Sequence, residues 1–139
     1  MRRLPQRILF SMLLAASAAS GCGSDTTTTP ITPTPTPTTE QFSGDLSRNG
    51  ATSHSFTVTG TGTVTSTLTT VAPDSTLSIG MALGTWNGTS CQVIIANDRA
   101  VQGITVTGTT SGLGALCVRI YDIGQLTTTV SYTVTVIHP

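Results

Sequence analysis

The sequence predicts an all-β protein, an antiparallel β-sandwich of jelly-roll type with about eight strands. From Glu40 onward the chain is dominated by threonine, valine, glycine, serine, leucine and isoleucine, a composition typical of strands. Apolar residues there recur at every second position, which is the period of a half-buried strand. Turn-forming pairs such as Asn49-Gly50 separate these runs, and no run has the period of an amphipathic helix.

Each alternating run is expected to form one strand. The first is the short segment 42–44, and in the next run Phe56 and Val58 share one face. The runs from the second onward span 54–59, 62–71, 77–84, 91–96, 103–109, 115–121 and 127–137. Turns are expected at Asn49-Gly50, Pro73-Asp74, Asn87-Gly88, Asn97-Asp98 and Gly112. The run 91–96 differs from the others because it is apolar on both faces. A closed barrel and a disordered Thr/Gly-rich tail are the alternatives, and the one-sided alternation favours the sandwich.

The N-terminus carries an export signal. Three arginines within the first seven residues precede the apolar segment 8–16, which is too short to span a bilayer. The segment Ala19-Ser20-Gly21-Cys22 then resembles the lipobox of bacterial lipoproteins, although Ala19 stands where leucine is usual. This resemblance implies that residues 1–21 are removed and that Cys22 receives the lipid. The alternative is an ordinary secretory signal, cut after residues 16–18, which leaves a free thiol at Cys22.

A Thr/Pro-rich linker is expected at 22–39, before the folded domain at 40–139. Residues 26–39 read TTTTPITPTPTPTT, a segment without apolar periodicity that is expected to remain outside any packed structure. Alternating Thr-Pro favours polyproline II, so these 14 residues extend ~40 Å as a semi-rigid stalk. Clustered threonine and proline are also typical of O-glycosylated stalks, which is the alternative interpretation.

Two further cysteines, Cys91 and Cys117, are expected to pair. In an exported chain two thiols usually form one disulfide bond, which here stabilises the fold by about 3–4 kcal/mol in the chain-entropy model. A redox or metal-binding thiol pair is the alternative, and the lack of C-x-x-C spacing disfavours it.

The charge pattern restricts the class of partner. Beyond residue 21 three arginines stand against six carboxylates, a net charge of −3, and lysine is absent. Nucleic acid and anionic lipid surfaces both require basic patches, so we expect neither as a partner. Contact with a membrane is expected through the lipid on Cys22. Asp25 is the fourth residue counted from Cys22, not the second, which favours the outer membrane or cell surface in the bacterial envelope.

The inventory of reactive side chains predicts a protein without enzymatic activity. His54 and His138 are the only histidines, and no G-x-S-x-G, H-E-x-x-H or phosphate-binding loop is present. We expect no cofactor. The weaker possibility is a structural calcium ion, because loop oxygens of Asp and Asn bind calcium in many β-sandwiches. The candidate ligands are Asp74, Asn97, Asp98 and Asp122.

Trp86, the single tryptophan, is the main candidate for a ligand contact, together with Asn97. An exposed indole can stack on a sugar ring or anchor a protein, whereas a buried one fills an end of the sandwich; we favour burial or partial burial. The expected function is a surface-structural or binding module. The alternative is adhesion to polysaccharide or matrix, so an envelope polysaccharide or protein is the possible partner; the sequence specifies no oligomeric state.

Two segments resemble the bacterial pre-peptidase C-terminal domain family. One is FSGDLSRNGATSHSFTVTGTGTVTSTLT, at the start of the domain, and the other is LCVRIYDIGQLTTTVSYTVTVIHP, at its close. The resemblance covers about residues 41–138 and implies a non-catalytic jelly-roll sandwich of the kind appended to secreted enzymes and surface proteins. No peptidase precedes the domain, and no acidic cluster is evident at 40–45, so the resemblance implies no metal ligand or binding residue here.

Overall fold

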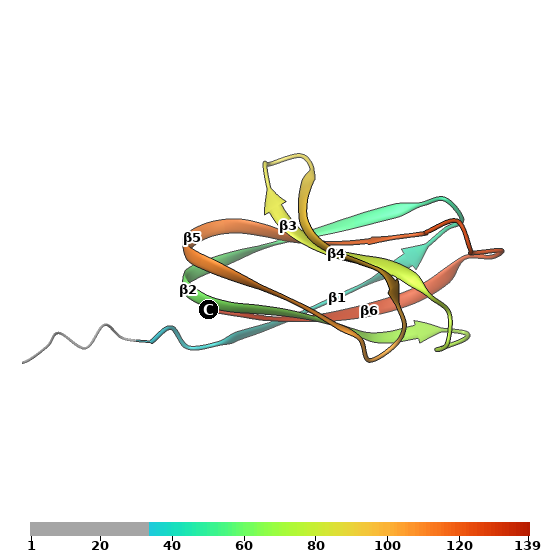
Figure 1. The fold of residues 1–139 in the computed structure, drawn as a ribbon, viewed down its shortest axis with the longest axis horizontal. Helices are drawn as coiled ribbons and strands as arrows, with labels where there is room; N and C mark the ends of the chain where they lie inside the picture. The colour runs from blue at the N-terminus through green and yellow to red at the C-terminus, as the bar shows by residue number, and fades with distance from the viewer. Residues whose placement is uncertain (1–33) are drawn as a thin grey trace, which may run out of the picture. The chain divides into compact units, whose positions relative to one another are not determined.

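The computed structural model describes residues 34–139, which fold as a β-protein of six strands (Figure 1). The strands are β1 (Thr38–Leu46), β2 (Ala51–Ala72), β3 (Ile79–Trp86), β4 (Cys91–Ala100), β5 (Thr105–Tyr121) and β6 (Val130–His138). The predicted all-β class is therefore confirmed. Over this part of the chain there is no helix with the length and apolarity needed to cross a membrane.

All six strands form one antiparallel sheet in the order β1-β6-β2-β5-β3-β4. The two longest strands, β2 and β5, pair with each other from Ala51–Tyr121 to Thr67–Thr105. The end of β2 also pairs with β6, and the end of β5 also pairs with β3. Each long strand thus contributes one half to each of two layers, and the sheet coils into a sandwich-like fold (Figure 1).

The prediction of eight strands is wrong, because two pairs of expected strands are continuous. The runs 54–59 and 62–71 both belong to β2, and the runs 103–109 and 115–121 both belong to β5. Gly60 and Gly112, where a break was expected, pair with each other across the two strands. Glycine lets a strand bend sharply without losing its partner, so these residues mark the passage between the layers and not the end of a strand.

Two other boundaries differ from the prediction. Asn97 and Asp98 lie within β4 instead of forming a turn. Their segment is irregular, because the register between β4 and β3 shifts between Ile79 and Met81. Such a shift bends the strand locally, and turn-forming residues such as Asn and Asp suit a bend as well as a turn. At the other end β1 begins at Thr38, inside the predicted linker, because Thr38 pairs with His138 of β6.

The core lies between the two layers and consists almost wholly of aliphatic side chains. Its branched residues include Val58, Leu68, Ile79, Val118, Ile120, Val134 and Val136, each 0% exposed. Ser66 is buried among these side chains, and its hydroxyl donates to Sδ of Met81 at 3.6 Å. The alternation of threonine and valine predicted from the sequence therefore places valine inside and threonine outside.

The outward threonines form cross-strand pairs. The hydroxyls of Thr67 and Thr105 lie 3.0 Å apart, and those of Thr69 and Thr135 lie 2.7 Å apart. Such pairs stabilise neighbouring strands by a few tenths of a kcal/mol each. The threonine-rich composition is thus explained in part by the stability of the sheet.

Candidate functional site

The hairpin between β3 and β4 ends in a loop that stands out from the body of the domain (Figure 1). We call residues 86–90 the hairpin tip. Asn87 Oδ1 accepts hydrogen bonds from the backbone N–H groups of Thr89 at 3.0 Å and Ser90 at 2.8 Å, and Gly88 has a φ of 99°. Asparagine and glycine are the residues that this turn requires, so the predicted turn at Asn87-Gly88 is confirmed.

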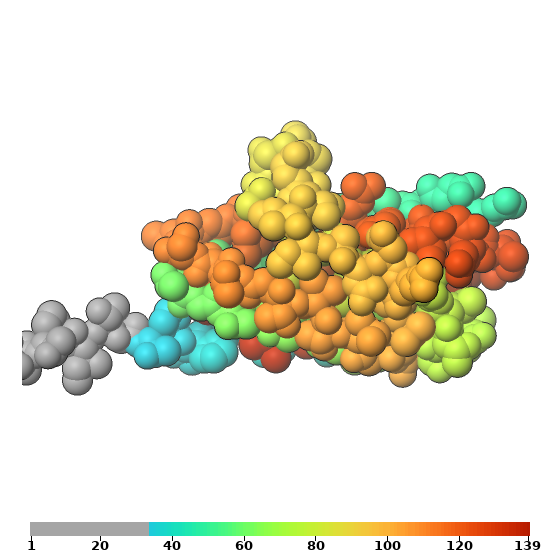
Figure 2. Space-filling model, in the orientation of Figure 1, coloured from blue at the N-terminus to red at the C-terminus, as the bar shows by residue number. Residues whose placement is uncertain are grey.

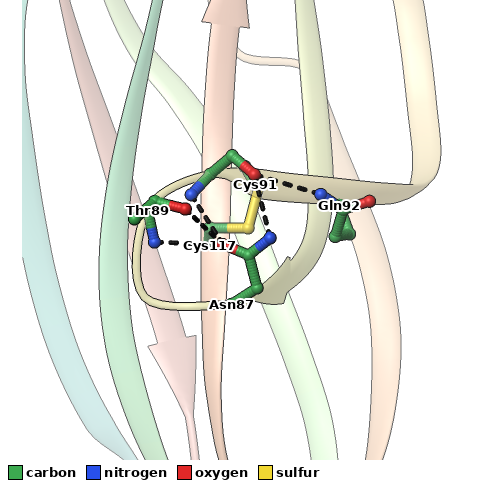
Figure 3. Close-up of a disulfide and its surroundings, with 6 residues drawn as sticks. Asn87, Thr89, Cys91, Gln92 and Cys117 are labelled. Carbon is green, nitrogen blue, oxygen red and sulfur yellow. Dashed lines mark hydrogen bonds between the residues drawn. A yellow bond between two sulfur atoms is a disulfide. The ribbon is translucent and has the colours of Figure 1, made fainter.

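A disulfide bond fixes the base of the tip (Figure 3). Cys91 begins β4 and Cys117 lies in β5, and their Cα atoms are 5.7 Å apart although β3 runs between these strands. Gly84 of β3 makes this possible, because the backbone of Gln92 and Val93 passes where a Cβ on Gly84 would lie. The two cysteines predicted to pair are therefore at bonding distance, and the hairpin is anchored to the central strand β5.

Trp86 occupies the start of the hairpin tip and is half-buried, with Cys91 as its cross-strand partner. Asn97, the second predicted ligand contact, pairs with Met81, five residues back along β3. That separation corresponds to ~16 Å of strand. Asn97 Oδ1 accepts a hydrogen bond from the backbone N–H of Arg99 at 2.8 Å. The structure therefore does not bring Trp86 and Asn97 together.

The acidic residues considered as calcium ligands each hold a piece of backbone or a neighbouring side chain. Asp74 Oδ1 accepts from the N–H and hydroxyl of Thr76 at 2.8 and 2.7 Å, and these hydrogen bonds lower the pKa of Asp74. Within residues 34–139 no three His, Cys, Asp or Glu side chains lie close enough together to hold a metal ion. The calcium candidates belong to separate local structures.

Asp122 organises the loop between β5 and β6. Its Oδ1 accepts from the N–H groups of Gly124, Gln125 and Leu126, and its Oδ2 accepts from the N–H of Asn49 at 2.8 Å. Desolvation raises the pKa of this carboxyl, but the four N–H donors outweigh it and the net pKa is lowered.

Asp98 accepts a hydrogen bond from the phenol of Tyr121, which crosses from β5 to the edge strand β4. Burial, and then the hydrogen bond and charge of Asp98, raise the pKa of Tyr121 to about 12. Arg119 lies with its guanidinium carbon 5.7 Å from the centre of the Tyr121 ring. These three side chains therefore fasten β4 to β5 across the small residues of β3.

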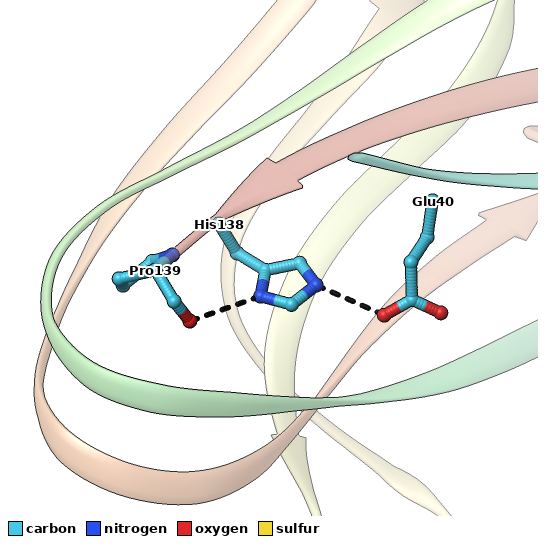
Figure 4. A network of polar contacts seen from close by, with 3 residues as sticks. All are labelled: Glu40, His138 and Pro139. Atoms are coloured by element: carbon cyan, nitrogen blue, oxygen red, sulfur yellow. Dashed lines mark hydrogen bonds and ion pairs between the residues drawn. The ribbon is translucent and has the colours of Figure 1, made fainter. Parts of the chain in front are cut away.

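Both histidines connect parts of the fold. His54 stacks on Phe42 with 5.1 Å between ring centres, and its Nε2 lies 2.8 Å from the hydroxyl of Tyr132. Burial lowers the pKa of His54, so its neutral form is favoured. His138 is 3% exposed; its Nε2 lies 2.9 Å from Glu40 Oε1 and its Nδ1 lies 3.2 Å from the carbonyl oxygen of Pro139 (Figure 4).

Strand β4 carries an exposed apolar segment. Its only signal in the sequence was the run 91–96, which is apolar on both faces. Val93, Ile94 and Ile95 are 45%, 68% and 39% exposed. Ile94 and Ile95 flank a groove of about 150 Å³ between β4 and β5. It is lined by Val64, Leu83, Gly84, Ile94, Ile95, Gly108, Thr109 and Leu116.

No protein-family model matches the chain, and no curated protein matches it. Cys22, the predicted site of lipidation, lies outside the described residues.

Proposed function

We propose that the protein is a non-catalytic, lipid-anchored module of the bacterial cell envelope, with a surface-structural or binding role. The observation that carries this proposal is the projecting hairpin tip, fixed by the Cys91–Cys117 bond to the centre of a rigid β-domain. A loop that is held rigidly and stands clear of its scaffold is the usual place for a recognition site.

The use of the histidines supports a role without catalysis. His54 is stacked and hydrogen-bonded between strands, and His138 is held by Glu40 and Pro139. A general base must reach the proton that it abstracts from a substrate, and both rings are instead engaged in contacts within the fold.

The order of parts along the chain supports display at the outer membrane or cell surface. Cys22 is followed by the Thr/Pro-rich segment, and the first strand begins at Thr38. The resemblance to the pre-peptidase C-terminal family is compatible with this arrangement and stays a prediction.

Lipidation is tested by growing cells with an alkyne-labelled fatty acid and recovering the full chain. We expect label on the wild-type chain and on a Cys91→Ser variant, and none on Cys22→Ser, which should also leave the membrane fraction. Label that persists in Cys22→Ser, or its absence from the wild type, would refute the anchor.

Adhesion to a polysaccharide or matrix protein is the second candidate function, favoured by the position of Trp86. Its indole is half-buried in the projecting hairpin tip, the loop that also carries the polar side chains of Asn87 and Thr89. A partly exposed indole with polar neighbours offers a flat apolar face to a sugar ring and hydrogen bonds to its hydroxyls.

Because Trp86 is the only tryptophan, its fluorescence reports on this site alone. We expect the emission to shift on addition of a bound glycan from a panel that also contains collagen. The Trp86→Ala variant should lose retention on the same immobilised ligand, whereas Leu113→Ala, at an exposed residue outside the hairpin tip, should keep it. Emission that is unchanged across the whole panel would remove this candidate.

A further inference from the structure

Strand β4 is an edge strand of the sheet, and its only charged residues, Asp98 and Arg99, lie near its end. Among the described strands it is hydrogen-bonded only to β3, so its other side presents unpaired backbone groups. Natural edge strands are guarded by charges, lysine above all, by proline or by bulges, because an open edge recruits another strand, and of these devices residues 91–97 have only the bulge at Ile94. Residues 91–97 contain neither a charge nor a proline. The opposite edge, β1, carries Glu40 and Asp45.

The open edge is apolar as well as unpaired. Ile94 is the extra residue where the register of β4 shifts, between the pairs Leu83–Ile95 and Gly84–Val93. A residue in such a bulge has no partner opposite it, and Ile94 is 68% exposed. The residues of β4 lie on the face of the domain turned toward the viewer in Figure 2, against those of β5.

The groove beside Ile94 has the size of one aliphatic side chain. An apolar cavity of about 150 Å³ accommodates a molecule as large as benzene. Gly108 lines the groove without a side chain; a Cβ there would lie at ordinary contact distance, 3.5 Å, from Cδ1 of Ile95. The groove opens onto Val64 of the core and onto Leu116, which is partly buried and packs against the core.

We propose that β4 is a self-association edge, at which two copies of this chain pair β4 to β4 in antiparallel fashion around Ile94 and Ile95. A two-fold interface uses the same patch on both subunits. Each copy therefore supplies both the protruding side chain of Ile94 and a groove that receives the Ile94 of the partner. The free N–H and C=O groups of the two edges then satisfy one another.

Charge and sequence favour a second copy over other occupants. Residues 91–97 of β4 are uncharged, so two copies meet there without repulsion between like charges. The Thr/Pro-rich segment of the chain itself is a poor strand partner, because its prolines lack N–H groups and Ile31 is its only branched aliphatic residue.

The small contact area predicts a weak dimer. A strand of ten residues is ~33 Å long, and a strip of that length and one strand's width is well below the ~800 Å² per partner of a stable interface. The dimer is expected to dissociate in the micromolar to millimolar range in solution. Anchoring on one membrane, if the proposed lipidation holds, raises the effective concentration and favours the paired state.

Sedimentation velocity on the full exported chain tests the proposal, with Cys22→Ser as the parent so that the result does not depend on the lipid. Over a range of about 5–500 µM, which brackets the affinity of a small interface, we expect the sedimentation coefficient to rise with concentration. Ile94→Lys should abolish the rise. Leu113→Lys, at a residue that is 81% exposed in β5, should leave it unchanged.

A second measurement locates the contact. In the Ile94→Cys variant mild oxidation should produce a covalent dimer, whereas Leu113→Cys at the same concentration should give little. A parent chain that stays monomeric throughout the range would refute the proposal. So would association that survives Ile94→Lys, or that Leu113→Lys weakens equally, since the latter indicates unspecific hydrophobic contact.

Discussion

Removal of the Cys91–Cys117 bond is expected to cost the domain a large part of its stability. The bond closes a loop with a sequence separation of 26. In the chain-entropy model this loop corresponds to about 3.5 kcal/mol at 25 °C. A domain of this size typically has about 5–10 kcal/mol of unfolding free energy, so the reduced protein should remain folded only marginally.

Urea unfolding followed by circular dichroism measures this loss. The wild type with and without a reductant gives the contribution of the bond alone. The double variant Cys91→Ala/Cys117→Ala adds the loss of sulfur packing at a site where Cys117 is 0% exposed, and should therefore be less stable than the reduced wild type. The slope of the unfolding free energy against urea concentration should become steeper in both the reduced wild type and the double variant, because the unfolded chain without its cross-link exposes more surface.

The position of the bond makes a local prediction as well. Amide exchange should accelerate first in the hairpin tip and at the start of β4, since Cys91 is what holds this edge to β5. A reduced protein that loses less than about 1 kcal/mol would contradict the entropic reasoning. Uniform acceleration over all strands would contradict the role assigned to the bond in anchoring the hairpin.

Three further changes have expected outcomes. Burial lowers the pKa of His54 below its ordinary value of 6.5, so the neutral ring favours the folded state, fully above pH 6.5 and progressively less as the pH falls below it. The melting temperature should therefore fall between pH 6.5 and 5, and His54→Gln should reduce that fall in a profile measured from about pH 8 to 5. Leu68→Ala, at a side chain that is 0% exposed, should lower the unfolding free energy in urea by about 2–5 kcal/mol, and a loss under 1 would contradict its place in the core. Asp122→Ala removes the acceptor of four backbone N–H groups and should cost about 1–3 kcal/mol, with Asp122→Asn restoring part of it; equal stability of Asp122→Ala and wild type would show that water replaces the carboxylate.

The fold class was predictable because its signal is local. Alternating valine and threonine specify which side chains of a strand point inward, and Asn87-Gly88 specifies a tight turn. Strand continuity was not predictable in the same way. Gly60 and Gly112 look like breaks along the chain, and only their pairing with each other shows that both strands bend at one place and continue. Strand order likewise depends on contacts between distant residues, as in the pairing of Thr38 with His138.

The candidate site was predictable in part. Two cysteines behind a predicted export signal were sufficient to predict their pairing, and the single tryptophan beside a turn predicted a position in a loop. The separation of Trp86 from Asn97 follows from the register of β3 and β4, which composition does not encode. The exposed edge at Ile94 depends on a bulge and on which strand lies outermost, and both are properties of the assembled sheet.

The position of β6 has a consequence for the time at which the domain can form. β6 lies between β1 and β2, so β1 has no hydrogen-bonded neighbour until residues 130–138 have been delivered. Pairing across about 100 residues is slow, because the chain must lose the entropy of closing so long a loop before any favourable contact between the strands has formed. If the proposed export proceeds N-terminus first, the chain therefore stays incompletely folded during its passage, and the domain closes only after β6 arrives.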